Sequence, residues 1–196
     1  MKKGWIILIV IALTFMGGCS MLTGKYNSMV NKSEAVKSAW SQVENVYQRR
    51  SDLIPNLVNT VKGYAAHEQE TFTAVIEARS KASSITIDPS KATPEQLKQF
   101  TQAQDGVSSA LSRLMVVVEK YPDLKANENF MALQSQLEGT ENRIAVERKR
   151  FNEVAQDYNT YIRRFPNNIL AGMFGFQPRA YFEAEKGAEK APKVEF

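Results

Sequence analysis

The side chains of this 196-residue chain that could do chemistry are a few polar residues that interrupt apolar stripes at helical spacing. They are Arg50, Glu68, Arg79, Gln104, Glu141 and Arg148. Two carboxylates that share a pocket and have well-separated pKa values can act as general acid and base. Glu68 and Glu141 would form such a pair if their helices align. An envelope hydrolase built on these two residues is therefore one alternative.

Metal and nucleophile chemistry is limited by the single histidine, His67. Di-metal helical bundles need a glutamate three residues before each histidine ligand, and Tyr64 occupies that position here. The chain also lacks a glycine-rich phosphate loop and a nucleophile elbow. We therefore expect no metal site, no cofactor and no enzymatic activity.

A structural role explains the same polar residues more simply. A buried polar residue can fix the register of packed helices, as it does in coiled coils. We predict that Arg50, Glu68, Arg79, Glu141 and Arg148 form such a structural polar layer. This interpretation predicts that the substitution Glu141→Ala lowers stability.

Cys19 is the only cysteine, and it follows two glycines at the end of an apolar run that begins after two lysines. This arrangement is typical of a secretory signal, and it resembles the lipobox of bacterial lipoproteins. The resemblance implies that Cys19 carries acyl chains such as palmitate after residues 1–18 are removed, with residues 19–24 as a tether. Met16 departs from the pattern, because Leu, Val or Ile is usual there.

An uncleaved transmembrane anchor is the alternative to a lipoprotein signal. Residues 4–22 carry no charge, and about 20 apolar residues cross a bilayer as a helix. Lys2 and Lys3 are expected on the cytoplasmic side in either case. Both alternatives place the bulk of the chain on the periplasmic or extracellular side of the cell membrane.

The charge of the chain indicates no nucleic-acid partner. Removal of residues 1–18 takes away two of the 25 basic side chains and leaves 25 − 2 = 23 against 21 acidic ones. A net charge of +2 is too small for a nucleic-acid footprint. Residues 183–196 are rich in Glu, Lys and Ala and have few large apolar residues, which predicts a disordered charged tail.

The rest of the chain consists of helical patterns. Apolar stripes at steps of three and four begin near Lys25, resume after Pro55 and run to about Ser83. Pro55 either kinks one very long helix or separates two, and we expect a kink. Residues 85–92 form a loop, and Thr93 followed by Pro94 and Gln96 predicts a capped helix start.

The last stripe sets the architecture. It contains Phe130, Leu133, Leu137, Ile144, Phe151, Ala155, Tyr158, Ile162 and Phe165. A helix over residues 126–165 would be roughly 60 Å long at about 1.5 Å per residue. The short link at residues 122–125 makes it fold back antiparallel. We predict an all-α, elongated antiparallel bundle of three to four long helices over residues 25–182.

Two features near the C-terminal end are less regular. Residues 169–182 are apolar without periodicity, and we expect them to pack over one end of the bundle; an exposed contact site is the alternative. Asn152 and Asn159 each follow an aromatic residue of the last stripe and lie one heptad apart. Their amides are placed to form hydrogen bonds across helices.

Short sequence blocks spread over residues 26–182 carry a resemblance to a known family. They include Ala39-Trp40-Ser41, Arg49 to Val58, Val61 to Tyr64, His67-Glu68, Ala78-Arg79, Glu119 to Ala126, Thr140 to Asn142, Tyr158-Asn159 and Phe165-Pro166. Together these blocks resemble the LemA family of bacterial envelope proteins. The resemblance implies a membrane-associated antiparallel helical bundle with an N-terminal hydrophobic segment and no established enzymatic activity.

We therefore expect a membrane-anchored scaffold or adaptor in the cell envelope that binds other proteins. The hydrolase and a hydrophobic-ligand carrier remain as alternatives, and a carrier would need an empty apolar cavity between the helices. Apolar stripes of this kind can be buried equally well within one chain or between copies of the chain. A homo-oligomer is therefore also possible.

Overall fold

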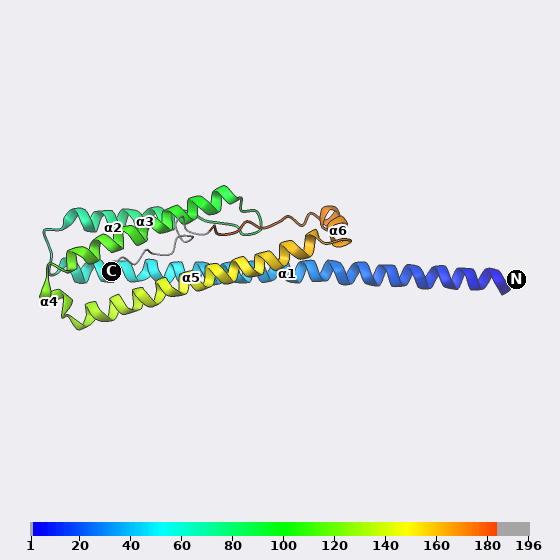
Figure 1. The fold of residues 1–196 in the computed structure, drawn as a ribbon, viewed down its shortest axis with the longest axis horizontal. Helices are drawn as coiled ribbons and strands as arrows, with labels where there is room; N and C mark the ends of the chain where they lie inside the picture. Colours follow the sequence, from blue (N-terminus) through cyan, green and yellow to red (C-terminus); the bar gives the residue numbers. More distant parts are fainter. Residues whose placement is uncertain (1, 184–196) are drawn as a thin grey trace, which may run out of the picture.

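In the computed structural model the described part of the chain, residues 2–183, is an all-helical, elongated bundle (Figure 1). It contains six helices. They are α1 (Lys2–Lys62), α2 (Gln69–Ser83), α3 (Pro94–Val118), α4 (Pro122–Lys125), α5 (Glu128–Arg163) and α6 (Asn167–Phe174). Side chains are described for residues 4–183, so most of the expected charged tail, residues 184–196, lies outside the described residues.

The four longer helices run up and down in sequence order (Figure 1). The chain reverses after α1, after α2 and again at the short helix α4, so α5 runs antiparallel to α1 along most of the bundle. α2 and α3 form the second closely packed pair. The expected antiparallel bundle of three to four long helices is therefore observed, with α1, α2, α3 and α5 as the longer helices.

α1 is one continuous helix of 61 residues, and only its second half belongs to the bundle. Residues 4–24 project beyond the other helices with every side chain exposed (Figure 1). From Met29 onward one stripe of the helix is buried, including Val36, Trp40, Val43 and Tyr47. We call residues 4–24 the free half of α1 and residues 25–62 its packed half.

Pro55 lies inside α1 and does not separate two helices. The expected long helix through to Ser83 is instead interrupted at residues 63–68, where the chain turns back into α2. Proline lacks an N–H, so the carbonyl of Ser51, four residues earlier, loses its helical donor. The Nε of Arg79 on α2 donates to that carbonyl at 2.8 Å. The contact between α1 and α2 thus satisfies the polar atom that the proline leaves unpaired.

Side-chain caps begin α3 and α5. At α3 the Oγ1 of Thr93 accepts from the N–H of Gln96 at 3.2 Å, and the Oε1 of Gln96 accepts from the N–H of Thr93 at 3.0 Å. This is the expected capping box. At α5 the Oδ1 of Asn127 accepts from the N–H of Phe130. α5 ends at Arg163, so Phe165 is exposed and does not continue the buried stripe.

Two apolar clusters form the core, one at each end of the bundle. The distal cluster joins the end of α1, α2, α3 and the start of α5, with Ile54, Val61, Val75 and Leu114 among its buried members. The proximal cluster lies nearer the free half of α1 and is rich in aromatic residues. There Trp40 contacts the rings of Phe100, Phe151 and Phe182 at centroid distances of 5.4 to 5.8 Å.

Residues 175–183 form a strap that runs back from α6 along α5 (Figure 1). Gly175 ends α6 with a positive φ of 74°, a conformation that glycine adopts without steric cost. Phe182, near the end of the strap, is buried and stacks on Trp40. The expected packing of residues 169–182 on the bundle is thus observed for the strap, whereas α6 keeps one exposed apolar face.

Candidate functional site

A buried arginine lies between the two apolar clusters. Arg50, on the packed half of α1, is only 2% exposed. Its Nη1 donates to Glu141 Oε2 of α5 at 2.9 Å and to Ser108 Oγ of α3 at 2.8 Å. Its Nη2 donates to the side-chain oxygen of Gln104 at 2.6 Å and to the Gln104 carbonyl at 3.1 Å. One guanidinium therefore joins three helices.

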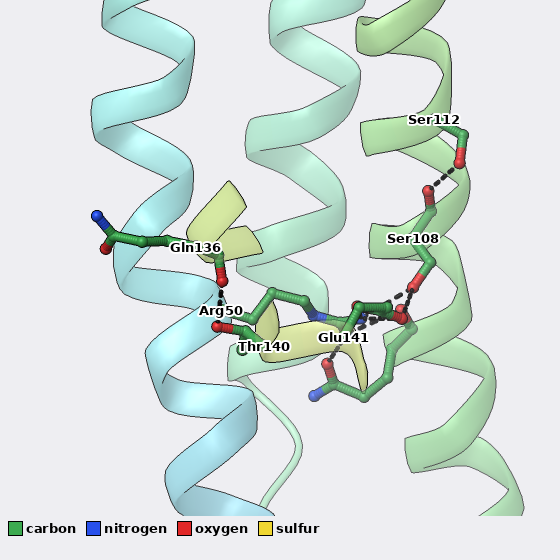
Figure 2. A network of polar contacts seen from close by, with 7 residues as sticks. Arg50, Ser108, Ser112, Gln136, Thr140 and Glu141 are labelled. Atoms are coloured by element: carbon green, nitrogen blue, oxygen red, sulfur yellow. Dashed lines mark hydrogen bonds and ion pairs between the residues drawn. The ribbon is translucent and has the colours of Figure 1, made fainter. Parts of the chain in front are cut away.

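The partners of Arg50 are also connected to one another, as Figure 2 shows. The hydroxyl of Ser108 donates to Glu141 Oε1 at 3.0 Å, so both carboxylate oxygens accept hydrogen bonds. The Glu141 side chain is 48% exposed, and water reaches that side of the ion pair. The arrangement is that of a structural ion pair, because both terminal nitrogens of Arg50 and both carboxylate oxygens of Glu141 have partners in the chain.

Two open clefts lie on either side of Arg50. One, of about 370 Å³, lies between α1, α2 and α3 and is lined by Glu44, Ser51 and Arg79 among others. The other, of about 650 Å³, lies over α3 and α5 and is lined by Lys98, Asp105 and Glu141 among others. Both contain charged side chains, unlike the apolar cavity that a hydrophobic-ligand carrier would need.

The other expected members of the polar layer, Arg79 and Arg148, lie apart from the contacts of Arg50. Arg79 donates to the Ser51 carbonyl, one turn of α1 away from Pro55, and does not join the Glu141 cluster. The guanidinium of Arg148, about two turns beyond Glu141 on α5, lies 4.9 Å from the ring centroid of Phe182. Gln104, which the sequence places on a seam, is a direct partner of Arg50.

The placement of Glu68 corrects an expectation. This residue lies in the link between α1 and α2, where it precedes α2 without capping it. Arg50 is 12 residues before the end of α1, which is about 18 Å of helix at 1.5 Å per residue. Glu68 therefore lies at the distal end of the bundle, away from Glu141. The two carboxylates of the hydrolase alternative are not brought together.

Burial changes the acidity of one residue beside the cluster. It raises the pKa of Tyr47 to about 12, although the nearby cations of Arg148 and Arg50 act in the opposite direction. The guanidinium carbon of Arg50 lies 5.2 Å from the centre of the Tyr47 ring. Tyr47 is neutral at physiological pH, and its role there is packing.

The two asparagines of α5 bond to the backbone of the strap, whereas the sequence suggested hydrogen bonds across helices. Asn159 donates to the carbonyl of Arg179 at 2.9 Å and accepts from the N–H of the same residue at 2.7 Å. Asn152 makes the same two-way contact with the backbone of Phe182, at 2.8 Å in each direction. The two amides hold the strap along α5 as a neighbouring strand would. Their spacing of one heptad was the signal for this arrangement.

Arg179 extends the strap to two further segments. Its Nη2 donates to the hydroxyl of Ser33 on α1 at 3.0 Å, and its Nη1 donates to the carbonyl of Ser90 in the α2–α3 loop. The guanidinium carbon lies 5.0 Å from the centre of the Tyr158 ring. A single strap residue therefore connects α1, α5 and the α2–α3 loop.

The free half of α1 contains the predicted lipidation residue. Cys19 is exposed, and its backbone is helical like that of its neighbours. Among the described residues, α1 alone is long and apolar enough to cross a membrane, with its apolar stretch near the N-terminus. An N-terminal apolar helix of this kind fits a membrane location, and lipidation of Cys19 stays a prediction.

Similar proteins agree with this fold and location. A profile described as LemA family matches residues 39–196. Magnetosome protein MamQ 2 of Paramagnetospirillum magneticum (strain ATCC 700264 / AMB-1) is 30% identical, over 96% of this chain and 75% of its own length. Protein LemA of Metamycoplasma hominis is 26% identical, over 83% of this chain and 71% of its own.

The names of these relatives denote no enzymatic reaction. The magnetosome protein aligns with nearly the whole chain, including the strap and most of the free half of α1. Together with the family profile over residues 39–196, this extent shows that the chain belongs to the LemA family.

Proposed function

We propose that the protein is a membrane-anchored helical scaffold of the bacterial cell envelope that binds other proteins through its bundle. The observation that carries this proposal is the contrast within α1, whose free half is apolar on all sides and touches nothing else in the described chain. A helix that is hydrophobic all round is stable only when protein or lipid surrounds it.

The orientation in the membrane follows from charge. Lys2 and Lys3 precede the apolar stretch, and such lysines stay on the cytoplasmic side. The bundle would then project from the opposite face, and its long axis would hold the distal end away from the bilayer. In this proposal the anchor is either the free half of α1 itself or acyl chains on Cys19.

The distal end offers surface for a protein partner. Val116 of α3 and Met131 of α5 are exposed by 65% and 49%, close to the α3–α4–α5 turn. Large apolar side chains this exposed are candidate positions for a protein contact. The satisfied ion pair of Arg50 and Glu141, by contrast, supports a structural role for the middle of the bundle.

The test is photocrosslinking in cells. A photoreactive amino acid replaces Val116 or Met131, and the matched control replaces Lys149, an exposed residue in the middle of α5. We expect both distal positions to capture the same membrane-associated protein and the control position to capture none. The same products at all three positions, or none at any, would contradict an adaptor role for the distal end.

A second comparison tests the anchor. The substitution Cys19→Ala is made in the chain that carries the photoreactive residue at position 116. Loss of the crosslinked partner together with loss of the protein from the membrane would support tethering through a lipid on Cys19. An unchanged crosslink with the protein still in the membrane would support the helix as the anchor.

A further inference from the structure

The corner between α5 and α6 exposes large apolar side chains that the bundle does not cover. Phe165, Ile169 and Met173 are 81%, 55% and 72% exposed. Ile169 and Met173 are four residues apart and share one face of α6. We call these three residues the corner surface.

The opposite face of α6 is fixed to the bundle. Leu170 and Ala171 are buried in the proximal cluster, and Asn167 donates from its side chain to the carbonyl of Tyr161 at 2.9 Å. The helix is therefore held in place while its other apolar face is uncovered. An exposed apolar face of this kind on a short, fixed helix marks a contact with another apolar surface, either protein or lipid.

The helix α6, which contains Ile169 and Met173, lies where α1 leaves the bundle (Figure 1). The ring of Phe174, at the end of α6, packs edge to face on Tyr26 with centroids 4.9 Å apart. Tyr26 follows Leu22, the last residue of the apolar stretch, by four residues, which is about 6 Å of helix. If residues 4–22 cross the bilayer, α6 lies at the level of its surface.

The charges at this end suit an anionic surface. Arg163 and Arg164 directly precede the corner surface, and both are exposed. Lys25 lies at the same level, with its ammonium 5.9 Å from the centre of the Tyr161 ring. The sequence has no acidic residue before Glu34 and none between Asp157 and Glu183. Cations flanking apolar side chains are the pattern of helices that bind anionic membrane surfaces.

We propose that the corner surface inserts into the headgroup layer of the bilayer that holds α1, with Arg163 and Arg164 on anionic lipid phosphates. This inference rests on the proposed membrane anchoring. A second contact beside α1 fixes how the bundle stands on the membrane, because one helix alone leaves the bundle free to tilt. The occupant of the surface is lipid, and a protein or a second copy of the chain is the alternative that the test separates.

The test uses the full chain in anionic vesicles, with the Cys19→Ser substitution and one new cysteine that carries an environment-sensitive fluorophore. The positions are Met173→Cys in the corner surface, Leu13→Cys in the free half of α1 and Val116→Cys at the distal end. Val116 is the matched control, because its exposure of 65% is close to that of Met173. Spin-labelled lipids, with the label near the headgroup or deep in the acyl chain, quench the fluorophore only on contact.

We expect the headgroup-level label to quench position 173 and the deep label to quench position 13, while neither quenches position 116. Quenching at position 13 without quenching at position 173 would overturn the inference and leave the anchor standing. No quenching at position 13 would overturn anchoring by the free half of α1, on which this inference rests. A shielded fluorophore at position 173 that lipid does not quench would show a protein contact and would also overturn the inference.

The two arginines beside the corner surface provide a second test, which measures how membrane docking depends on their charge. Replacing Arg163 and Arg164 by glutamine removes two surface cations without touching a buried residue. We expect the ratio of docked to undocked corner to fall by about fivefold per arginine in anionic vesicles, and to change little in neutral vesicles. An equal response in both vesicle types would contradict the assignment of anionic headgroups as the ligand.

Discussion

The free and packed halves of α1 share one backbone and differ in everything around it. The packed half buries a single stripe and presents polar residues elsewhere, as a helix on a soluble bundle does. The free half is apolar on every face and buries nothing in the described chain. The comparison teaches that one continuous helix can have a first half suited to an apolar environment and a second half suited to a soluble bundle. Because the helix is continuous, it also couples the bundle mechanically to whatever surrounds the first half.

The largest expected effect sharpens this contrast by comparing two tryptophans of the same helix. Trp40 is 2% exposed at the centre of the aromatic cluster, whereas Trp5 in the free half is 72% exposed. Trp40→Ala should lower the free energy of unfolding of the bundle by about 4 kcal/mol. Trp5→Ala should leave it unchanged. Denaturant unfolding in detergent, followed by circular dichroism, measures both, and equal losses would contradict the division of α1 into two halves.

The next effect tests the burial of Tyr47 in the packed half, through the dependence of the free energy of unfolding on pH. The pKa of Tyr47 is raised to about 12 by burial, so the folded state keeps a proton that the unfolded chain releases near pH 10. The stability from this group is therefore complete below pH 10 and is lost as the pH rises towards 12. The loss should be about 3 kcal/mol.

Tyr47→Phe isolates this effect, because other groups also titrate in the same range. The wild type should lose about 3 kcal/mol more than Tyr47→Phe between pH 10 and pH 12. Urea unfolding at several pH values provides the comparison. Parallel curves for the two proteins would show that the ring of Tyr47 reaches water, and that this part of α1 is less buried than the structure indicates.

A smaller effect concerns the only arginine that the packed half buries. Glu141→Ala removes the carboxylate partner of Arg50 and should lower stability by about 2 kcal/mol. This is less than the loss for a fully buried pair, because the Glu141 side chain is half exposed. The matched control is Glu138→Ala, one turn earlier on α5, whose exposed carboxylate accepts only from Gln134. Thermal unfolding of both variants should separate them, and similar losses would argue against the register role.

The smallest effect tests how α1 stays continuous at Pro55. Arg79→Ala should cost about 1 kcal/mol, because the Ser51 carbonyl loses its donor. In a Pro55→Ala background, residue 55 regains an N–H that can serve that carbonyl, so the cost of Arg79→Ala should shrink. A double-mutant cycle should give a coupling of about 0.5–1 kcal/mol. If the effects of the two substitutions on the free energy of unfolding simply add, Arg79 does not act through the Ser51 carbonyl.

The sequence predicts much of the fold, because helix periodicity and capping residues are local signals. Thr93 and Gln96 identify the start of α3, and the stripe from Phe130 to Ile162 identifies α5. Pro55 lies inside one helix, as expected, but the sequence left two separate helices as an open alternative. Its effect depends on whether a distant side chain serves the carbonyl of Ser51, and Arg79 does so from another helix.

The polar cluster could be predicted only in part, for the same reason. The stripes show that Arg50, Gln104 and Glu141 interrupt apolar seams, so each needs a partner. Which residues meet depends on the axial offset between helices, and the offset is set by the lengths of the links. The unexpected end of α1 at Lys62 moves Glu68 into a link and out of the cluster.

The measurement that tests the account most directly is the retention of the protein in alkaline-washed membranes after two arginines are placed in the free half of α1. Ile9→Arg with Leu13→Arg should weaken insertion by about 3 kcal/mol for each arginine. The matched control, Gln42→Arg, adds an arginine at an exposed position of the packed half. We predict that the double variant leaves the membrane fraction with an intact bundle, while Gln42→Arg stays. Equal retention of both in the membrane would contradict the assignment of the free half of α1 as the anchor.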